Sequence, residues 1–212
     1  MSSSDNPGSL FIVVAPSGAG KTSLVRGLLG AEPAVRLSVS FTTRAPRPGE
    51  RDGVDYHFIG TGEFEERRRA GEFLEWAQVH GNLYGTSRAW ITAQMAAGSD
   101  ILLEIDCQGA KQVRRLFPDA VGIFIAPPSI DELRRRLRAR AQDSEDVIER
   151  RIAAARAELA QAGEFEYVII NQDFGTASRQ LCSVVQAARL RFGRQRARNP
   201  DTFAALHLGS RP

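Results

Sequence analysis

The chain has 212 residues, of which 42% are hydrophobic and 25% charged, a composition typical of globular proteins and unlike that of disordered, collagen-like or membrane proteins. Its 28 basic and 25 acidic residues leave a net charge of +3, which argues against a dedicated nucleic-acid-binding protein. No apolar stretch reaches the roughly 18–20 residues of a membrane span, and the first residues do not resemble a signal peptide. We therefore expect a cytoplasmic protein that binds neither nucleic acid nor membrane.

Cys107 and Cys182 are too few for a disulfide framework, and neither lies in a CxxC pair. Both are interpreted as small buried hydrophobic residues. Among the basic residues only Lys21 and Lys111 are lysines. A lysine kept at position 21 in so arginine-rich a chain indicates a need for a compact charge on a flexible stem.

Four short apolar runs rich in Val and Ile predict buried strands, at residues 10–15, 101–105, 121–126 and 167–170. Helical patterns lie between them. One covers residues 21–30, with Leu24, Val25 and Leu28 on one face, and a long one near the end runs from Leu181 to Phe192. Strands with little alternation, separated by helices, indicate an α/β fold with a parallel sheet flanked by helices.

Two stretches depart from this pattern. Residues 40–95 combine turn signals, aromatics and alternating polar residues, which suits an α+β insertion. In residues 132–156 an arginine-rich helix follows a capping box from Ser129 to Glu132, and residues 142–144 break it. The predicted core is then 9–39, 96–131 and 157–196, with flexible termini at 1–8 and 197–212. The oligomeric state is not indicated.

A glycine-rich segment follows the first predicted strand and opens the first helix. It reads Ala15-Pro-Ser-Gly-Ala-Gly-Lys21-Thr22, the pattern of a phosphate-binding loop (P-loop) except that Ala15 replaces the first glycine. Backbone N–H groups and the helix N-terminus would bind phosphates, Lys21 would reach the β and γ phosphates of ATP, and the Thr22 hydroxyl would ligate Mg²⁺. Alanine is acceptable at position 15 only with a negative φ. The alternative is a strand-to-helix turn that merely uses glycine.

Further polar residues gather in the 40–95 insertion. Arg44 and Arg47 bracket a proline, Tyr56 follows, and Glu75 and Tyr84 come downstream. Guanidinium groups and phenol hydroxyls suit a phosphate dianion. Taken singly, each has another interpretation: the arginines as a solvated turn, the tyrosines as packing residues and Glu75 as a surface charge.

These segments together resemble guanylate kinase, a nucleoside-monophosphate kinase of the P-loop class that transfers a phosphoryl group from ATP to GMP. The resemblance runs from about residue 10 to residue 190. It implies a P-loop core, an α+β GMP-binding insertion and a helical lid. It also implies that the GMP or dGMP phosphate is held by Arg44, Arg47, Tyr56 and Tyr84, and that Ser40, Glu75 and Thr86 meet the guanine.

The chemistry of guanine agrees with the role implied for Glu75. Guanine presents N1–H and N2–H₂ as adjacent donors, and an ionised carboxylate can accept from both. Adenine has an acceptor at N1 and lacks the N2 amine, so a buried carboxylate facing it would be unpaired. Sites built on such hydrogen bonds discriminate by roughly 10⁴ or more.

The remaining site residues are also implied by the resemblance. Asp106, at the end of a predicted strand, would lie beside the guanine and the metal, although an acidic residue there can simply cap a helix. Arg136, Arg140 and Arg151 would close over the triphosphate as catalytic residues together with Lys21. ATP would be bound by Ser17, Gly18, Ala19, Gly20, Lys21, Thr22, Ser23 and Asn171.

Two other functions remain open at this stage. A catalytically silent interaction module could share the fold, although such modules generally lose phosphate-loop or lid residues that are present here. The second alternative is a related kinase that acts on another phosphorylated sugar or nucleotide. Ser40, Glu75 and Tyr84 together favour guanine over such a substrate. Transfer to a nucleotide 5′-phosphate needs no general base, because this phosphate, with a second pKa of about 6, is mostly dianionic at neutral pH.

Overall fold

A five-stranded parallel sheet forms the centre of the computed structural model, which describes residues 8–79, 81–139 and 144–209. The strand order is β2-β7-β1-β8-β9, with β1 at Leu10–Val14, β2 at Val35–Leu37, β7 at Asp100–Glu104, β8 at Val121–Ala126 and β9 at Tyr167–Ile170. Four of these strands confirm the predicted ones to within a residue. β2 was missed because it has three residues, of which only Val35 is buried.

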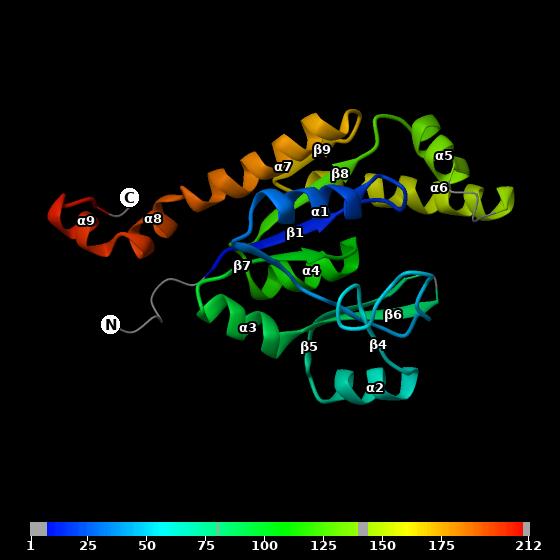
Figure 1. Cartoon of the computed structure of the whole chain (residues 1–212), viewed down its shortest axis with the longest axis horizontal. Helices are drawn as coiled ribbons and strands as arrows, with labels where there is room; N and C mark the ends of the chain where they lie inside the picture. The colour runs from blue at the N-terminus through cyan, green and yellow to red at the C-terminus, as the bar shows by residue number, and fades with distance from the viewer. Residues whose placement is uncertain (1–7, 80, 140–143, 210–212) are drawn as a thin grey trace.

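Helices cover both faces of this sheet (Figure 1). On one face α1 (Lys21–Ala31) and α7 (Phe174–Arg189) pack against Phe11 and Val13 of β1. On the other, α3 (Arg88–Ala96) and α4 (Cys107–Leu116) pack against Leu10, Ile12 and Val14. Alternate residues of one strand thus enter two cores, which explains why β1 is apolar throughout. The predicted α/β fold with a parallel sheet flanked by helices is confirmed.

The 40–95 insertion contains the second sheet, with strand order β4-β3-β6-β5. Its strands are β3 (Phe41–Thr42), β4 (His57–Phe58), β5 (Phe73–Val79) and β6 (Asn82–Ser87), accompanied by α2 (Thr61–Arg69). β5 and β6 are antiparallel, and their register places Glu75 opposite Thr86. The element types agree with the α+β character predicted for this stretch.

The arginine-rich stretch forms a pair of helices, α5 (Ile130–Ala139) and α6 (Glu145–Leu159). They share a small core of their own made by Leu133, Leu137, Ile148, Ile152 and Ala155. The predicted capping interaction is present, because the N–H of Glu132 donates to Oγ of Ser129 at 3.0 Å. We call α5 and α6 the lid helices. Of the predicted helix break at 142–144, residues 142 and 143 lie outside the described residues, and Ser144 is the residue before α6.

The C-terminal part is more helical and more segmented than predicted. After the 3₁₀ turn at Ala162–Glu164 and strand β9, helix α7 ends at Arg189, so the prediction of a single helix reaching Phe192 was wrong. The backbone is extended at Arg191, and α8 (Phe192–Arg198) and α9 (Pro200–Ala205) follow. An apolar periodicity cannot distinguish one helix from two that meet at a bend, and Leu190, at the bend, is 70% exposed. The flexibility expected of residues 197–212 stays a prediction.

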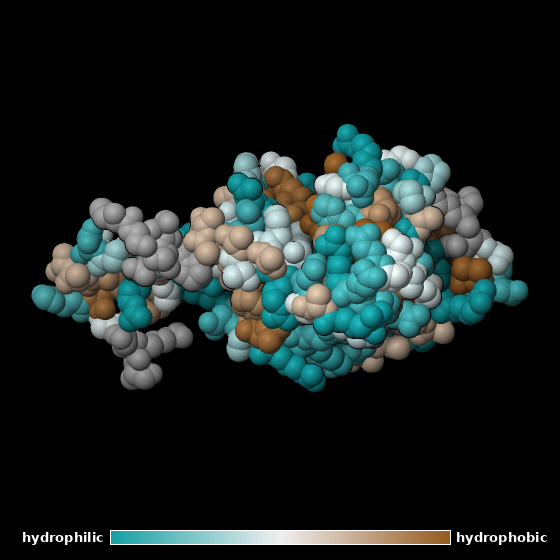
Figure 2. Space-filling view, turned by 90° about the horizontal axis from the view of Figure 1, so that it is seen from below, coloured by the Kyte–Doolittle hydropathy of each residue, from teal (hydrophilic) through white to brown (hydrophobic). Residues whose placement is uncertain are grey.

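The end of α7 is attached to the sheet by charges. The Arg189 guanidinium donates from Nε to Asp100 at 2.7 Å and from Nη1 to Glu32 at 2.6 Å. Asp100 is 2% exposed and also accepts from the backbone N–H of Ser9. Beyond this anchor, α8 and α9 extend away from the sheet (Figure 1). The face of the molecule seen in Figure 2 is mainly hydrophilic, with small, scattered hydrophobic areas. Among the cysteines, Cys107 is buried as predicted, whereas Cys182 is only partly so.

Candidate active site

The phosphate loop connects β1 to α1 and depends on two glycines with positive φ. Gly18 has φ 96° and Gly20 has φ 95°, values that disfavour residues with a β-carbon. Both glycines are also closely packed, because a β-carbon at Gly18 would lie 3.0 Å from Cδ1 of Leu133, and one at Gly20 would overlap the side-chain amide of Asn171. His207 is the one non-glycine residue with positive φ in the described ranges, so Ala15 has the negative φ that its β-carbon requires.

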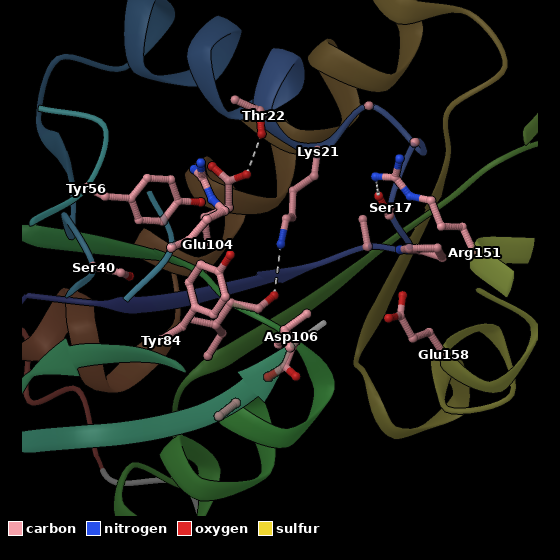
Figure 3. A pocket seen from close by; sticks show the side chains of 18 of the residues that line it. Ser17, Lys21, Thr22, Ser40, Tyr56, Tyr84, Glu104, Asp106, Arg151 and Glu158 are labelled. Carbon is pink, nitrogen blue, oxygen red and sulfur yellow. Dashed lines mark hydrogen bonds between the residues drawn. The ribbon is translucent and has the colours of Figure 1, made fainter. Parts of the chain in front are cut away.

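The first residues of α1 point toward the strand end of β7. Nζ of Lys21 donates to the carbonyl oxygen of Ile105 at 3.0 Å, and Oγ1 of Thr22 donates to Oε1 of Glu104 at 2.6 Å (Figure 3). Because β1 and β7 are adjacent and parallel, their carboxyl ends bring the phosphate loop and Glu104 to one edge of the sheet. Both side chains thus lie at this edge, and their predicted contacts with phosphate and Mg²⁺ stay predictions.

A cavity of about 280 Å³ opens at this edge between the phosphate loop and the second sheet. Figure 3 shows Ser40, Tyr56 and Tyr84 at one end, Ser17 and Arg151 at the other, and Lys21 between them. The predicted site residues that line the cavity are Ser17, Gly18, Gly20, Lys21, Thr22, Ser23, Ser40, Arg44, Arg47, Tyr56, Glu75, Tyr84, Asp106 and Arg151. Segments separated by more than a hundred residues in the chain therefore meet in one cavity.

At the second-sheet end, Arg44 is held by Glu50 before any ligand arrives. Nη2 of Arg44 contacts both carboxylate oxygens of Glu50 at 2.8 and 2.9 Å, and the backbone N–H of Arg47 donates to the same carboxylate at 2.7 Å. The Arg44 guanidinium also lies 5.3 Å from the centre of the Tyr56 ring, which meets Tyr84 edge-on at 6.0 Å. Burial raises the pKa of Tyr56 to about 12, so its hydroxyl stays protonated and can donate.

Glu75 is a deeply buried carboxyl group on β5. It is 3% exposed, and Oγ1 of Thr86 donates to its Oε1 at 2.5 Å. Burial raises the pKa of Glu75 to about 7, against the smaller lowering by the Thr86 hydroxyl. The interpretation of Glu75 as a surface charge is therefore wrong. Thr86 is fully buried and touches Glu75, and its predicted contact with guanine stays a prediction.

Asp106 has a structural role in addition to its place in the cavity wall. Its Oδ1 accepts from the N–H of Gly109 at 2.9 Å, which caps α4. Its Oδ2 accepts from the side-chain amide of Gln108 at 3.0 Å. The helix-cap interpretation is thus confirmed, and the predicted place beside guanine and metal stays a prediction.

The lid arginines face different cavities. Nη2 of Arg151 on α6 donates to Oγ of Ser17 at 2.7 Å, inside the main cavity. Arg136 on α5 donates from Nη2 to the carbonyl oxygen of Asn171 at 2.8 Å and from Nε to Glu132 at 2.8 Å. It lines a second cavity. Arg140 lies outside the described residues. Both arginines nevertheless contact the phosphate loop, since Nη1 of Arg136 also donates to the carbonyl oxygen of Ala19 at 3.4 Å. Their joint action on a triphosphate stays a prediction.

Asn171 supports the phosphate loop from behind. It is 5% exposed, and its Nδ2 donates to the carbonyl oxygen of Ala19 at 2.7 Å. Ala19 itself is fully buried, so it shapes the loop without lining the main cavity. Asn171 does line the second cavity beside Gly20, and its predicted contact with adenine remains to be tested.

Two carboxylates of this site were not identified from the sequence. Glu50 holds Arg44, and the signal was its place in the same turn as the two arginines. Glu158 lines the cavity seven residues after Arg151, a spacing that puts both on one face of α6. Within the described residues Oε2 of Glu158 is buried and has no hydrogen-bond partner, and burial raises the pKa of this carboxyl.

Comparison with known proteins agrees with this geometry. The family model described as guanylate kinase matches residues 8–188. The chain belongs to the guanylate kinase family. It is 59% identical over 200 residues to the guanylate kinase of Aromatoleum aromaticum and 60% identical over 199 residues to that of Dechloromonas aromatica, covering 94% of this chain and 98% of the relative in each case.

A solved structure supports the same assignment. The crystal structure of guanylate kinase from Anaplasma phagocytophilum superimposes with a TM-score of 0.73 at 32% identity, covering 89% of this chain and 90% of that one. Guanylate kinases are nucleoside-monophosphate kinases that use ATP as the phosphate donor with Mg²⁺. In the described parts of the chain, no helix combines the length and apolar character needed to cross a bilayer.

Proposed function

We propose that this chain transfers the γ-phosphoryl group of ATP to GMP or dGMP, giving ADP and GDP or dGDP, through the cavity between the phosphate loop and the second sheet. The observation that carries the proposal is that one cavity is lined at one end by Ser17 and Arg151 and at the other by Arg44 and Tyr56, with Lys21 and Thr22 between them. A single cavity with a cationic group at each end suits two anionic nucleotides placed end to end. Family membership supports the same reaction.

The monophosphate would bind at the Arg44 end. Arg44 is already oriented, with Nη2 bonded to Glu50 and Nη1 to the Ala45 carbonyl oxygen, and it would give up part of these bonds to a phosphate. Tyr56 and Tyr84 add hydroxyl donors. Arg47 lines the same wall with an exposed side chain that is able to reach a ligand. A phosphate monoester dianion needs no base to remove a proton, so these residues act by positioning its oxygen for in-line attack.

The base of GMP would lie against Glu75, with Ser40 close to the same wall. The Thr86 hydroxyl uses one lone pair of Glu75 Oε1, which leaves other lone pairs on the two oxygens for N1–H and N2–H₂ of guanine. Ser40 is 9% exposed and lines the cavity. Asp106 borders the same region.

The phosphate loop would hold ATP. Residues of the loop and the first residues of α1 line the cavity, and their backbone N–H groups would bind the phosphates. Lys21 has to exchange its bond to the Ile105 carbonyl for the β and γ phosphates. Arg151 is within reach of the same phosphates because it already touches Ser17. Positive charge near the transferred group stabilises the charge spread over its oxygens.

The residues present fit a magnesium ion bound together with nucleotide. In the described parts of the chain no group of three or more His, Cys, Asp or Glu side chains could hold a metal by itself. Mg²⁺ characteristically takes one or two protein oxygens together with substrate phosphates and water, and Thr22 with Glu104 offers that set. When bound, the ion neutralises charge on the β and γ phosphates.

We further propose a cytoplasmic enzyme of purine nucleotide metabolism that acts on free nucleotides, without nucleic acid or membrane. The small net charge of +3 supports this. The division into core, GMP-binding insertion and lid at the predicted boundaries is likewise a proposal, supported by the second sheet within 40–95. α6 continues to Leu159, three residues beyond the predicted end of the lid.

A coupled assay of ADP formation tests the reaction. We expect turnover with GMP and dGMP, and little with AMP, UMP or CMP. Lys21→Ala should reduce turnover by at least about 100-fold, as loss of one preplaced charge commonly does. Lys111→Ala, which removes the other lysine from the surface of α4, is the matched control and should leave turnover unchanged. A chain that binds these nucleotides but forms no ADP would instead be the interaction module considered above.

A further inference from the structure

The first turn of α4 lies directly against the buried carboxylate of Glu75. Gly109 is the third residue of this helix, and its N–H is engaged by the Asp106 cap. A β-carbon built on Gly109 would lie 3.0 Å from Cδ of Glu75 and closer still to Oε2, with Oδ1 of Asp106 at 3.4 Å. The bare Cα of this glycine therefore provides the space that the carboxylate occupies.

Neither partner is free to withdraw. One turn after Gly109, the side chain of Gln112 bonds both backbone groups of Trp76, donating from Nε2 to the carbonyl oxygen at 2.7 Å and accepting from the N–H at 3.3 Å. Trp76 is the neighbour of Glu75 on β5, so this pair fixes α4 on the strand at the level of the carboxylate. On its other side Glu75 is fixed by the 2.5 Å bond from Thr86.

We propose that Gly109 is a positioning residue for guanine selection, which keeps Glu75 aimed into the cavity because it has no side chain. The inference rests on the proposed role of Glu75 as the group that meets guanine. Any side chain at position 109 overlaps the Glu75 carboxylate, whereas Asp106 stays at an ordinary contact distance. The carboxylate therefore has to move, since the helix backbone is held by Gln112. Guanine recognition should then weaken while ATP binding, on the far side of Lys21, is preserved.

The test is Gly109→Ala, with GMP compared with inosine monophosphate, which lacks the N2 amine. A correctly aimed carboxylate accepts a hydrogen bond from N2–H₂ only when GMP is bound. Displacing it should therefore lower kcat/KM for GMP by about 10- to 100-fold. The ratio of kcat/KM for GMP to that for inosine monophosphate should fall by about 10-fold. The KM for ATP should change by less than about twofold, as for a site whose contacts are untouched. An unchanged preference, or equal losses for GMP and ATP, would overturn the inference.

Gly27→Ala is the matched control. It is also a glycine inside a helix, α1, and a β-carbon there would meet only Oγ of Ser178 at 3.3 Å and the Phe174 ring at 3.6 Å, away from the cavity. Both replacements bring the higher helix propensity of alanine. Gly27→Ala should therefore leave the kinetics and the GMP preference unchanged.

Glu75→Ala provides a second arm through a double-mutant cycle. If Gly109 acts through Glu75, adding Gly109→Ala to Glu75→Ala should cause no further loss with GMP, because nothing remains to be displaced. Should Gly109→Ala alone fail to fold, a folded double variant would support the overlap with Glu75, and an unfolded one would overturn it. Glu75→Gln separates the two hypotheses. If it leaves the GMP preference intact, the role of Glu75 is wrong, and if it removes the preference while Gly109→Ala does not, only the present inference fails.

Discussion

At the scale of single residues, Glu75 couples recognition to protonation. Its pKa is raised to about 7 by burial, so near neutral pH a substantial fraction of the free protein carries a protonated carboxyl there. Guanine donates with both N1–H and N2–H₂ and needs the ionised form. Binding of GMP should therefore release a proton from this group.

We expect the contribution of Glu75 to GMP affinity to rise with pH through about 7 and then level off, and to fall by nearly tenfold per unit below about pH 6. The phosphate of GMP also titrates near pH 6, so it contributes to the same profile. Glu75→Gln retains only the phosphate contribution and should give a weaker but flatter profile. Calorimetric titration in buffers of different ionisation enthalpy measures the released proton, and equal proton release by both proteins would contradict the role of Glu75.

The same raised pKa predicts an effect on stability without nucleotide. Because the folded protein holds this proton up to about pH 7 and the unfolded chain loses it near 4.5, the unfolded state binds fewer protons in this window, and stability falls as pH rises through it. At pH 8 Glu75→Gln should therefore be more stable by about 2–3 kcal/mol, and at pH 4 the difference should nearly vanish. Urea titrations at pH 8 and pH 4 measure the free energy of unfolding of both proteins. If Glu75→Gln is less stable than the original protein at both pH values, the predicted effect of the Glu75 pKa on stability is wrong.

At the scale of elements, the position of each segment was easier to predict from sequence than its contacts. The phosphate loop was found because a buried strand, two glycines, Lys21 and a helix occur in register. β2 was missed because a strand of three residues carries too little sequence signal. The bend after α7 was missed because the apolar period continues across it. Burial of Glu75 could not be predicted, since it depends on β6 and α4 meeting β5. The bond from Arg136 to Asn171 joins residues 35 apart, which no local pattern reveals.

The lid helices deliver Arg151 to the phosphate loop, and its planar fork matters there. Arg151→Lys keeps the charge but cannot both hold Ser17 and reach a phosphate in the same geometry. We expect kcat to fall by roughly 10- to 100-fold with little change in the KM for GMP. Arg150→Lys, the neighbour with an exposed side chain, serves as the control and should be neutral in steady-state kinetics. Equal kinetics for the two variants would exclude the role of Arg151.

At the scale of the whole molecule, the Arg189 ion pairs join the end of α7 to Asp100, the first residue of β7, and to Glu32, directly after α1. Arg189→Met should leave the nearly fully buried Asp100 without its principal cation and destabilise the fold by about 3–5 kcal/mol. Because this anchor lies at the opposite sheet edge from the cavity, kcat and KM at low temperature should stay near their original values. Arg191→Met, at an exposed position, should cost under about 1 kcal/mol. Urea unfolding compares the stability of Arg189→Met and Arg191→Met. Similar unfolding midpoints for the two variants would show that the Arg189 ion pairs do not stabilise the fold.

The lid helices and the second sheet flank one cavity from different sides, so two bound anions that bridge them should draw both inward. We expect the radius of gyration to decrease when an ATP analogue and GMP are added together, and to decrease less with either alone. Small-angle scattering measures this change. An identical radius in all four states would show that the cavity is already closed.

Among the described residues, no group of three or more potential metal ligands surrounds Thr22 and Glu104, which has a consequence for how metal reaches the enzyme. A bare dication would have to give up strongly held water in return for one carboxylate and a hydroxyl that is already occupied. The triphosphate offers it far more oxygen, so the ion should travel in with the donor nucleotide and depart with the diphosphate. The magnesium concentration should then control the activity by setting the fraction of donor nucleotide that is bound to magnesium. No separate metal site on the protein would need to be filled.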